Sequence, residues 1–537
     1  MSTSTKWENV IKELFSTKNT FFTASELINV LSEKLEISRE YSRQIIKRAV
    51  NKKFIKNSHP FKFKNGQYVY MGVTDTLDLK TLINISKLYK PSMYRVLTLL
   101  FKEDKLLSFY EARKAAATPV ENIDRYKLTR LDDEIKELIH HDYICTVKDS
   151  EKNIIYITTK EMEDSPLLST MMKNHYEKMR LDSMFIPDII RWLKEHNLID
   201  SDMLLYRRTD NPSIGAKHND FLWDFYSYTN TTGFSINTGK KDKQTLLVMD
   251  VLVHRPYSKE DLDGFYNRIQ SVRHSTHSEA RKVLPIIIFN EIPQEVKKEI
   301  RRLQILNFSL PSVFGMKVSE LIQRLTDIRK ASAGTFHTED QSSDIIEDIE
   351  KTLKLMDESG QIDNLQNIKG ALFESLMYVV ISNIFPHNSR LNHSKMIKPY
   401  EYDVIVQRDE EVIIIELKGL KNSTIINLGD YKTNATVKWF FGNTLPHAKR
   451  AYTIPSSPFE YNKTKIKACY ITSANFSEEA LHWLEEINKS KLKPETLDCF
   501  YDRKRLLKLI KTHENLSSLR KSTAFIDILE KFYLKEQ

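Results

Sequence analysis

Hydrophobic positions follow strand spacing and helical spacing in turn along the chain, and the clearest strand pattern lies within residues 402–419. Residues 412–415 are continuously apolar, which is typical of a strand buried on both faces. A shorter apolar run, 404–406, precedes them, and the acidic residues 409–411 predict a turn between the two. We therefore expect two adjacent strands inside a larger α/β region. Further elements predicted around them are an apolar helix over 370–384, strands over 466–472 and 497–501, a helix that follows Ser473 and runs through Trp483, and a helix over 503–510.

The first 72 residues predict three helices followed by a hairpin of strands. The helices are expected over 7–16, 24–35 and 39–52, with Thr23 and Ser38 as N-caps of the last two. Alternating strands within 54–71 surround Asn65-Gly66, a favoured tight turn. This order of elements is typical of a winged helix.

Residues 73–179 repeat this plan, so we expect a second winged helix. Its predicted elements are helices over 92–101, 108–117 and 129–140 and strands over 144–147 and 154–158. The third helix carries Asp132, Asp133, Glu134 and Glu137, which would repel phosphate groups. We therefore expect this helix to serve in packing or dimerisation rather than in binding DNA.

Composition limits the class of protein. A chain of 537 residues is long enough for several domains, and its net charge of +9 and pI near 9.0 favour a polyanionic partner. Its three cysteines form no CxxC pair, so neither a zinc site nor a disulfide framework is expected. The N-terminus lacks a signal-peptide pattern, and no apolar run is long enough to span a membrane. A cytoplasmic location without membrane attachment is therefore predicted.

The first unit holds most of the excess positive charge. Residues 1–72 contain 13 Lys and Arg against 6 Asp and Glu, which leaves +7 of the chain's +9. The third predicted helix of this unit is basic. Such a helix can lie in the major groove of double-stranded DNA, where its cations contact phosphates and its Arg or Gln side chains contact base edges. A solvated helix face, or a winged helix that contacts proteins, remains the alternative. The predicted DNA-binding residues are Arg39, Arg43, Gln44 and Lys47 on the third helix and Lys62 and Lys64 on the wing.

The predicted strand pair also carries chemistry. Glu416 and Lys418 are two residues apart and project from the same face of a strand, and a hairpin register would bring Asp403 to the same place. Two carboxylates can hold Mg²⁺, for which Mn²⁺ can substitute, and a lysine can orient water and offset negative charge. Glu-x-Lys occurs four times in the chain, but only here does it follow a β-branched run with an aspartate upstream. A solvated surface hairpin or a structural ion pair is the alternative.

Glu374 is a further candidate on the helix that precedes the strand pair. A carboxylate in this position is common as the third acid of two-metal phosphodiester sites. The alternative is a glutamate that is favoured near a helix N-terminus by the helix dipole.

These elements, in this order, resemble the PD-(D/E)XK nuclease superfamily over about residues 365–512. The segments IKACYITSANFSEEALHWLEE and LDCFYDRKRLLKLI look most like the catalytic domain of Mrr-type restriction endonucleases. The resemblance implies that Glu374, Asp403 and Glu416 are metal ligands and that Lys418 is the catalytic lysine. Residue 402 is Tyr where the family has a nominal Pro, a change that does not touch the chemistry. No Gln occurs between Lys418 and Gln537, so the Gln-x-x-x-Tyr element of RecB-like exonucleases is absent, which favours an endonuclease.

Residues 180–330 predict a second copy of the same order of elements, with apolar strands over 245–253 and 283–289. Asp224 and Asp250 fall near the places of Asp403 and Glu416, but Leu252 stands where Lys418 would be. Leucine supplies neither charge nor a proton, so we interpret this copy as a degenerate nuclease-like α/β domain that binds DNA or braces the active copy. An unrelated α/β domain is the alternative. Candidate DNA contacts in this region are Arg207, Arg208, Lys240 and Lys241.

The predicted organisation is therefore a multidomain α/β protein with two N-terminal winged helices. The expected boundaries are 1–72 and 73–179 for the winged helices, 180–330 for the degenerate domain, 331–364 for a linker and helix, and 365–537 for a restriction-endonuclease-like α/β/α domain. The resemblance implies a Mg²⁺-dependent DNA endonuclease of restriction or anti-phage defence, possible targeting of modified DNA, and 5′-phosphate and 3′-hydroxyl ends. A homodimer is expected, because two strands must be cut and the chain has one catalytic copy. A non-catalytic DNA-binding regulator and a recombination or transposition nuclease are the alternatives.

Overall fold

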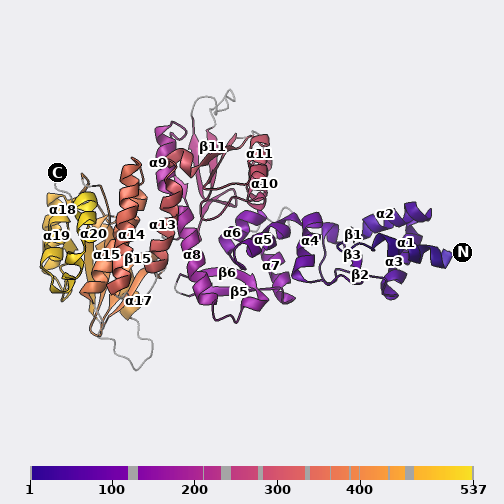
Figure 1. Cartoon of the computed structure of the whole chain (residues 1–537), viewed down its shortest axis with the longest axis horizontal. Helices are drawn as coiled ribbons and strands as arrows, with labels where there is room; N and C mark the ends of the chain where they lie inside the picture. The colour runs from indigo at the N-terminus through magenta and orange to yellow at the C-terminus, as the bar shows by residue number, and fades with distance from the viewer. Residues whose placement is uncertain are drawn as a thin grey trace.

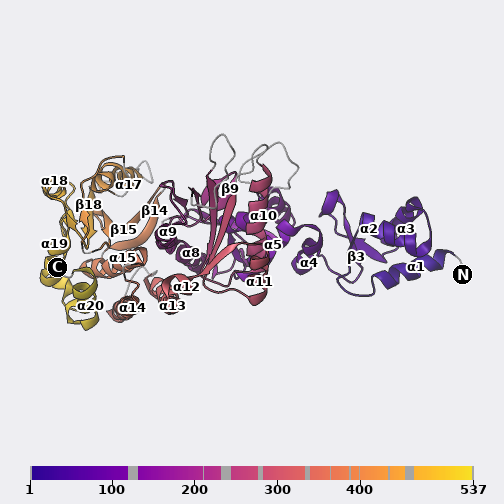
Figure 2. The same ribbon diagram turned by 90° about the horizontal axis from the view of Figure 1, so that it is seen from above.

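The computed structural model describes residues 3–118, 131–150, 152–209, 211–230, 244–275, 282–332, 339–362, 364–385, 389–397, 399–421, 423–432, 436–453 and 465–534. The fold is mixed α/β, and its units follow one another along an elongated molecule with the two chain ends far apart (Figures 1 and 2). In the part of the chain described here, no helix is both long enough and apolar enough to cross a membrane.

The first unit contains three helices and a small antiparallel sheet of order β1-β3-β2. Thr23 caps α2 and forms a reciprocal capping box with Glu26, and Ser38 caps α3, as their sequence positions predict. Asn65 and Gly66 both have positive φ and form the expected tight turn. However, the strands are shorter than the predicted hairpin, because Pro60 has no backbone N–H for a ladder. The elements are α1 Thr3–Leu14, β1 Phe22–Thr23, α2 Ala24–Leu35, α3 Arg39–Asn51, β2 Ile55–Asn57, η1 Lys64–Gly66 and β3 Val69–Gly72.

The second unit repeats this order of elements and has the corresponding sheet order β4-β6-β5. The apolar pattern misses two of its elements, the helix α4 and the strand β4, which is too brief to show an alternation. Phe61 and Phe63 of the first unit are buried in the same core as Leu107 and Leu131 of the second unit, so the two units are packed together. The elements are α4 Leu79–Tyr89, α5 Pro91–Lys102, β4 Leu106–Ser108, α6 Phe109–Ala116, α7 Leu131–His140, β5 Ile144–Asp149 and β6 Ile154–Thr159.

The central unit is built on a five-stranded sheet covered by helices on both faces. Strands β11 and β12 are buried along their whole length, as continuous apolar runs predict. The elements are η2 Lys160–Met162, α8 Leu168–Met184, α9 Ile186–Glu195, β7 Leu205–Tyr206, β8 Ala216–His218, β9 Phe221–Trp223, β10 Phe225–Thr229, β11 Thr245–Leu252, α10 Lys259–Ser275, β12 Val283–Phe289, α11 Gln294–Arg302, β13 Leu306–Ser309, α12 Leu310–Phe314 and α13 Val318–Ser332.

The C-terminal unit has a second five-stranded sheet with helices on both faces. The predicted helix with Glu374 and the predicted strand pair correspond to α15, β15 and β16. The elements are α14 Glu339–Glu358, α15 Gln366–Ile384, β14 Arg390–Ile397, β15 Tyr400–Gln407, β16 Glu411–Lys418, β17 Ile425–Ile426, α16 Val437–Trp439, η3 Phe440–Thr444, α17 Leu445–Thr453, β18 Lys465–Thr472, β19 Asn475–Phe476, α18 Glu478–Asn488, β20 Phe500–Tyr501, α19 Arg503–Thr512, η4 Glu514–Leu516, η5 Leu519–Lys521, α20 Thr523–Ile528 and η6 Leu529–Tyr533.

The two five-stranded sheets have the same strand order and the same strand directions. The order is β7-β10-β11-β12-β13 in the central sheet and β14-β15-β16-β18-β20 in the C-terminal sheet. In both sheets the first two ladders are antiparallel and the last two are parallel. The repeated order of elements expected from the sequence is therefore present in the fold.

The two α/β units share one hydrophobic core. This core joins Leu247 and Ile286 of the central sheet to Val404 and Ile413 of the C-terminal sheet through the helices that lie between them. Two expected boundaries are consequently displaced. Position 179/180 falls inside α8 and position 330/331 falls inside α13, whereas α14 lies within the segment predicted to hold a linker and a helix.

Candidate functional site

The strand register brings Asp403, Glu416 and Lys418 together at one end of the C-terminal sheet. Val404 pairs with Ile415, so Asp403 lies opposite the end of β16, and its Oδ2 accepts a hydrogen bond from the Leu417 N–H at 2.7 Å. Lys418 Nζ lies 2.7 Å from Glu416 Oε1 and 3.9 Å from Asp403 Oδ2. The predicted convergence of these three side chains is therefore observed.

Glu374 reaches the same place from α15. It is half-buried and lines a cavity of about 1030 Å³ together with Asp403, Glu416 and Lys418. The close approach of α15 to the end of β16 depends on two glycines: a Cβ on Gly419 would lie 2.5 Å from Phe373 Cβ and 3.1 Å from Gly370 Cα. Small residues at these two positions thus let the helix deliver Glu374 to the cavity.

Negative charge dominates the electrostatics of this site. Burial, and then the charges of Glu416 and Glu374, raise the pKa of Asp403 well above its usual value, although Lys418 acts in the opposite direction. For Lys418 burial lowers the pKa, but Glu416 and Asp403 outweigh it and raise the pKa above its usual value. Three carboxylates, Glu374, Asp403 and Glu416, line this part of the cavity together with the ammonium of Lys418, so the site is short of positive charge.

The residues fit a hard divalent cation, but not with the predicted set of three ligands. Within the described residues, no three carboxylate, imidazole or thiolate groups are close enough together to hold a metal ion. Lys418 Nζ lies 2.7 Å from Glu416 Oε1, and Glu374 does not complete a group of three ligands with Asp403 and Glu416 in the described structure. Mg²⁺ is commonly held by one or two carboxylates with water and phosphate oxygens, so Asp403 and Glu416 are the pair that could hold it.

Asp224 and Asp250 of the central unit occupy the equivalent positions. Asp224 Oδ2 accepts a hydrogen bond at 2.8 Å from the N–H of Val251, the residue between Asp250 and Leu252. Asp403 makes the same bond to the residue between Glu416 and Lys418. The sequence correspondence, including leucine at the place of the lysine, is therefore reproduced in the geometry.

The central acidic pair is nevertheless covered by other groups of the chain. Tyr110 Oη donates to Asp224 at 2.5 Å, and Lys114 Nζ lies 2.5 Å from Asp224 and 3.2 Å from Asp250. Both residues come from α6 of the second unit. Arg207 pairs with Asp224 at 3.3 Å and Arg268 with Asp250 at 2.8 Å. Only about 30 Å³ of space is left beside these groups.

The cations around the central pair lower the pKa of Asp224, whereas the pKa of Asp403 in the C-terminal pair is raised. Burial favours the neutral form of Asp224, but Lys114 and Arg207 hold its pKa below the usual value. The prediction that Arg207 contacts DNA is wrong, because its side chain is only 2% exposed and is bonded within the core. Of the other candidates, Lys240 and Lys241 lie outside the described residues, and Arg208 is exposed and lines the large cavity.

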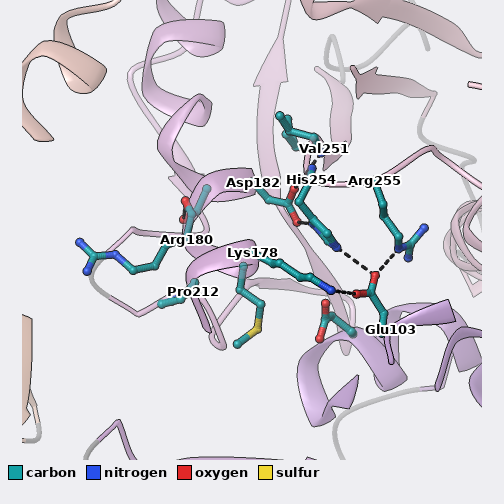
Figure 3. A network of polar contacts seen from close by, with 12 residues as sticks. Glu103, Lys178, Arg180, Asp182, Pro212, Val251, His254 and Arg255 are labelled. Atoms are coloured by element: carbon teal, nitrogen blue, oxygen red, sulfur yellow. Dashed lines mark hydrogen bonds and ion pairs between the residues drawn. The ribbon is translucent and has the colours of Figure 1, made fainter. Parts of the chain in front are cut away.

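A second buried network joins α5 and β11 next to this pair. His254 lies between Asp182 and Glu103, with both ring nitrogens 2.9 Å from a carboxylate oxygen, and Arg255 also pairs with Glu103 (Figure 3). Burial lowers the pKa of His254, but the two carboxylates raise it to about 9. Sequence reasoning missed this network, since no local spacing pairs Glu103 with residues so far along the chain.

The basic residues predicted on α3 lie on its solvent face. Arg39, Arg43, Gln44 and Lys47 are exposed, while Ser42, Ile45, Ile46 and Ala49 on the other side are buried. On the wing, Lys62 is exposed between the buried Phe61 and Phe63, and the Lys64 side chain is outside the described part. In the second unit Glu134 is buried and lies 3.7 Å from Lys90, so α7 uses this acid in packing.

Comparisons of this chain with protein-family models, with curated proteins and with solved structures found no match.

Proposed function

We propose that this protein is a metal-dependent endonuclease that hydrolyses phosphodiester bonds of DNA at its C-terminal site. The observation that carries the proposal is the meeting of Asp403, Glu416 and Lys418, with Glu374 nearby, at the wall of a large cavity. An acidic site that is short of positive charge suits a divalent cation, and the cavity gives room for a substrate.

Each side chain has a distinct part in the proposed reaction. Asp403 and Glu416 would hold Mg²⁺, which when bound would polarise the phosphate and acidify a bound water. Lys418 orients the attacking water and offsets the negative charge that develops on the phosphate oxygens. The Leu417 N–H fixes the Asp403 carboxylate through the 2.7 Å bond, so the ligand is already oriented. Glu374 acts from the cavity wall on the charge of this cluster rather than as a ligand of the same ion.

A plasmid-nicking assay tests the catalytic proposal. The parent protein is expected to nick DNA with Mg²⁺ or Mn²⁺ and to be inactive with chelator. Lys418→Ala removes an electrostatic partner of the transition state and is expected to reduce the rate by about 10²–10³-fold, and Asp403→Ala at least as much. Equal nicking by all three proteins would contradict the site assignment. Absence of nicking by the parent on both plain and methylated plasmid would favour the non-catalytic regulator.

The first unit is proposed to be a winged helix that binds duplex DNA. Support comes from the order of its elements and from the exposed side chains Arg39, Arg43, Gln44 and Lys47 on one face of α3. The double variant Arg43→Ala/Lys47→Ala is expected to weaken duplex binding and to reduce the slope of log K against log salt by about 0.9 for each phosphate that is no longer neutralised. The variant Glu33→Ala/Glu36→Ala, in an exposed acidic region of the same unit, is the control. Unchanged slopes in the basic variant would exclude this face.

A role in restriction or anti-phage defence, including action on modified DNA, rests on the sequence resemblance alone. The resemblance further implies a homodimer for double-strand cutting. Sedimentation of the protein with and without duplex DNA tests this, since a monomer in both conditions would restrict the enzyme to nicking one strand at a time.

A further inference from the structure

The large cavity is lined by both α/β units, which contribute different charged side chains. The C-terminal unit contributes the acids already described and Glu401, together with Lys418 and Lys421. The central unit contributes three arginines: Arg180 from α8, Arg191 from α9 and Arg208 after β7. Arg180 is nearly buried and lies 3.8 Å from Glu401 of β15, whereas Arg191 is 40% exposed and Arg208 is also exposed. A phosphate chain crossing the cavity would therefore meet the acidic metal-binding side and a basic side at once.

Aromatic and apolar side chains line the same cavity. Leu205 and Tyr206 of the edge strand β7 are 42% and 37% exposed, so they contribute little to the core. Trp439 lies on the C-terminal side, half-buried, with its ring centroid 6.4 Å from that of Tyr400. Aromatic rings next to basic side chains are the features with which proteins bind unpaired nucleotides, because every base has a face that can stack.

The exposed aromatic rings favour one strand over two. The cavity volume of about 1030 Å³ is just above the range of about 300–1,000 Å³ typical of small-ligand sites, so the cavity has room for a few nucleotides. In a double helix the bases are stacked on one another and would offer no face to Tyr206 or Trp439, whereas the bases of a single strand would.

We propose that this cavity takes one strand of a polynucleotide and that the degenerate central unit supplies half of the binding site. Arg191 and Arg208 contact backbone phosphates, Tyr206 and Trp439 stack on bases, and the strand passes the acids on the opposite side. The inference rests on the proposed nuclease function and narrows its substrate to DNA that has, or is opened to, a single-stranded segment. Duplex recognition is left to the first unit.

Fluorescence anisotropy of the full-length protein in chelator tests this binding without cleavage. The probes are a labelled oligodeoxyuridylate, a labelled oligouridylate, which differs from it only in the sugar, and a blunt hairpin duplex. Tyr206→Ala is expected to weaken strand binding by about 5- to 100-fold. Arg208→Glu is expected to weaken it and to reduce the salt slope by about 0.7 for each phosphate that the variant no longer neutralises. Neither variant is expected to change binding of the duplex.

Matched surface variants serve as controls. Met203→Ala truncates an apolar residue that is 50% exposed beside β7, and Arg302→Glu reverses a charge that is 73% exposed on α11. Both are expected to bind the strand as the parent does. Wild-type strand affinity in Tyr206→Ala and Arg208→Glu, or an equal loss of duplex affinity, would overturn the proposal. Tighter binding of the deoxyribose oligomer that depends on Tyr206 supports it, and tighter binding of oligouridylate would overturn the assignment to DNA.

Photocrosslinking of the parent with an oligonucleotide that contains 5-iododeoxyuridine gives an independent answer if a variant fails to fold. Crosslinks in peptides with Tyr206 or Trp439 are expected, and crosslinks confined to the first unit would overturn the proposal. The nicking assay separates this inference from the proposed function. Nicking that requires Asp403, without strand binding that requires Tyr206, refutes the inference alone. Strand binding that requires Tyr206, without nicking that requires Asp403, refutes the catalytic proposal alone.

Discussion

The two acidic pairs of this protein have the same backbone setting and opposite surroundings. In both, an aspartate accepts a hydrogen bond from the residue after the second acid at the end of the middle strand. Asp224 and Asp250 are matched by Lys114, Arg207 and Arg268 and are left with almost no free space. Asp403 and Glu416 have one lysine and face a large cavity. A shared sheet geometry therefore does not decide whether a site is open, because that depends on what neighbouring elements place over it.

The largest expected difference between the pairs is in stability. Asp224→Asn removes the carboxylate nearest to the buried Lys114 and Arg207, leaving them only Asp250 at 3.2 Å and Asp182 at 3.8 Å, which is expected to cost about 3 kcal/mol and to lower the melting temperature by several degrees. Asp403→Asn removes one of several crowded negative charges and is expected to leave the melting temperature unchanged or slightly higher. Scanning calorimetry of the two variants is the measurement. Equal losses in both would remove the electrostatic distinction between the sites.

The pH dependence of stability tests the buried network of His254 with Asp182 and Glu103. His254 faces Asp182 on α8 and Glu103 after α5, and Glu103 is in turn contacted by Arg255, Lys178 and His175. The pKa of His254 is raised to about 9 in the folded protein, above the ordinary histidine value near 6.5. Its contribution is therefore fully present below about pH 6.5 and is lost as the pH rises to about 9, by up to about 3 kcal/mol.

Denaturant titrations of the parent and His254→Gln across this pH range measure that contribution. The parent is expected to lose stability between neutral and alkaline pH, and the variant is expected to show a flatter profile. Parallel profiles of stability against pH would show that this network does not depend on a charged His254.

The smallest expected effect comes from a single hydroxyl. Tyr110→Phe removes the hydrogen bond from the second unit to Asp224, a bond to a charged acceptor worth about 1.5–3 kcal/mol. The lower part of that range is expected, because Lys114 and Arg207 still contact the carboxylate. Thermal denaturation of Tyr110→Phe is compared with that of Tyr206→Phe, whose exposed ring lies outside this contact. Equal melting temperatures would mean that the Tyr110 hydroxyl does not stabilise the central pair.

Local pattern is sufficient to predict much of the fold and the C-terminal pair. Continuous apolar runs predict β11, β12 and β16, and the two-residue spacing of Glu416 and Lys418 places them on one face. The covering of the central pair could not be predicted, because Lys114 lies more than a hundred residues from Asp224 and an interaction across such a distance leaves no periodicity.

The same limit applies to the shared core and to Arg207. The segment 331–364 is predicted to begin with a linker, whereas α13 continues to Ser332 and α14 begins at Glu339. Arg207 has the charge expected of a DNA contact, but the chain around it does not reveal that a neighbouring unit buries it. The burial of a site residue by distant segments of the chain therefore cannot be predicted from the local sequence.

Calorimetric titration with Mn²⁺ tests most directly whether only the C-terminal pair is free to take a divalent cation. The parent is expected to bind Mn²⁺, Asp403→Asn is expected to lose that binding, and Tyr110→Phe is expected to retain it. Failure of the parent to bind Mn²⁺, or unchanged binding by Asp403→Asn, would contradict the account.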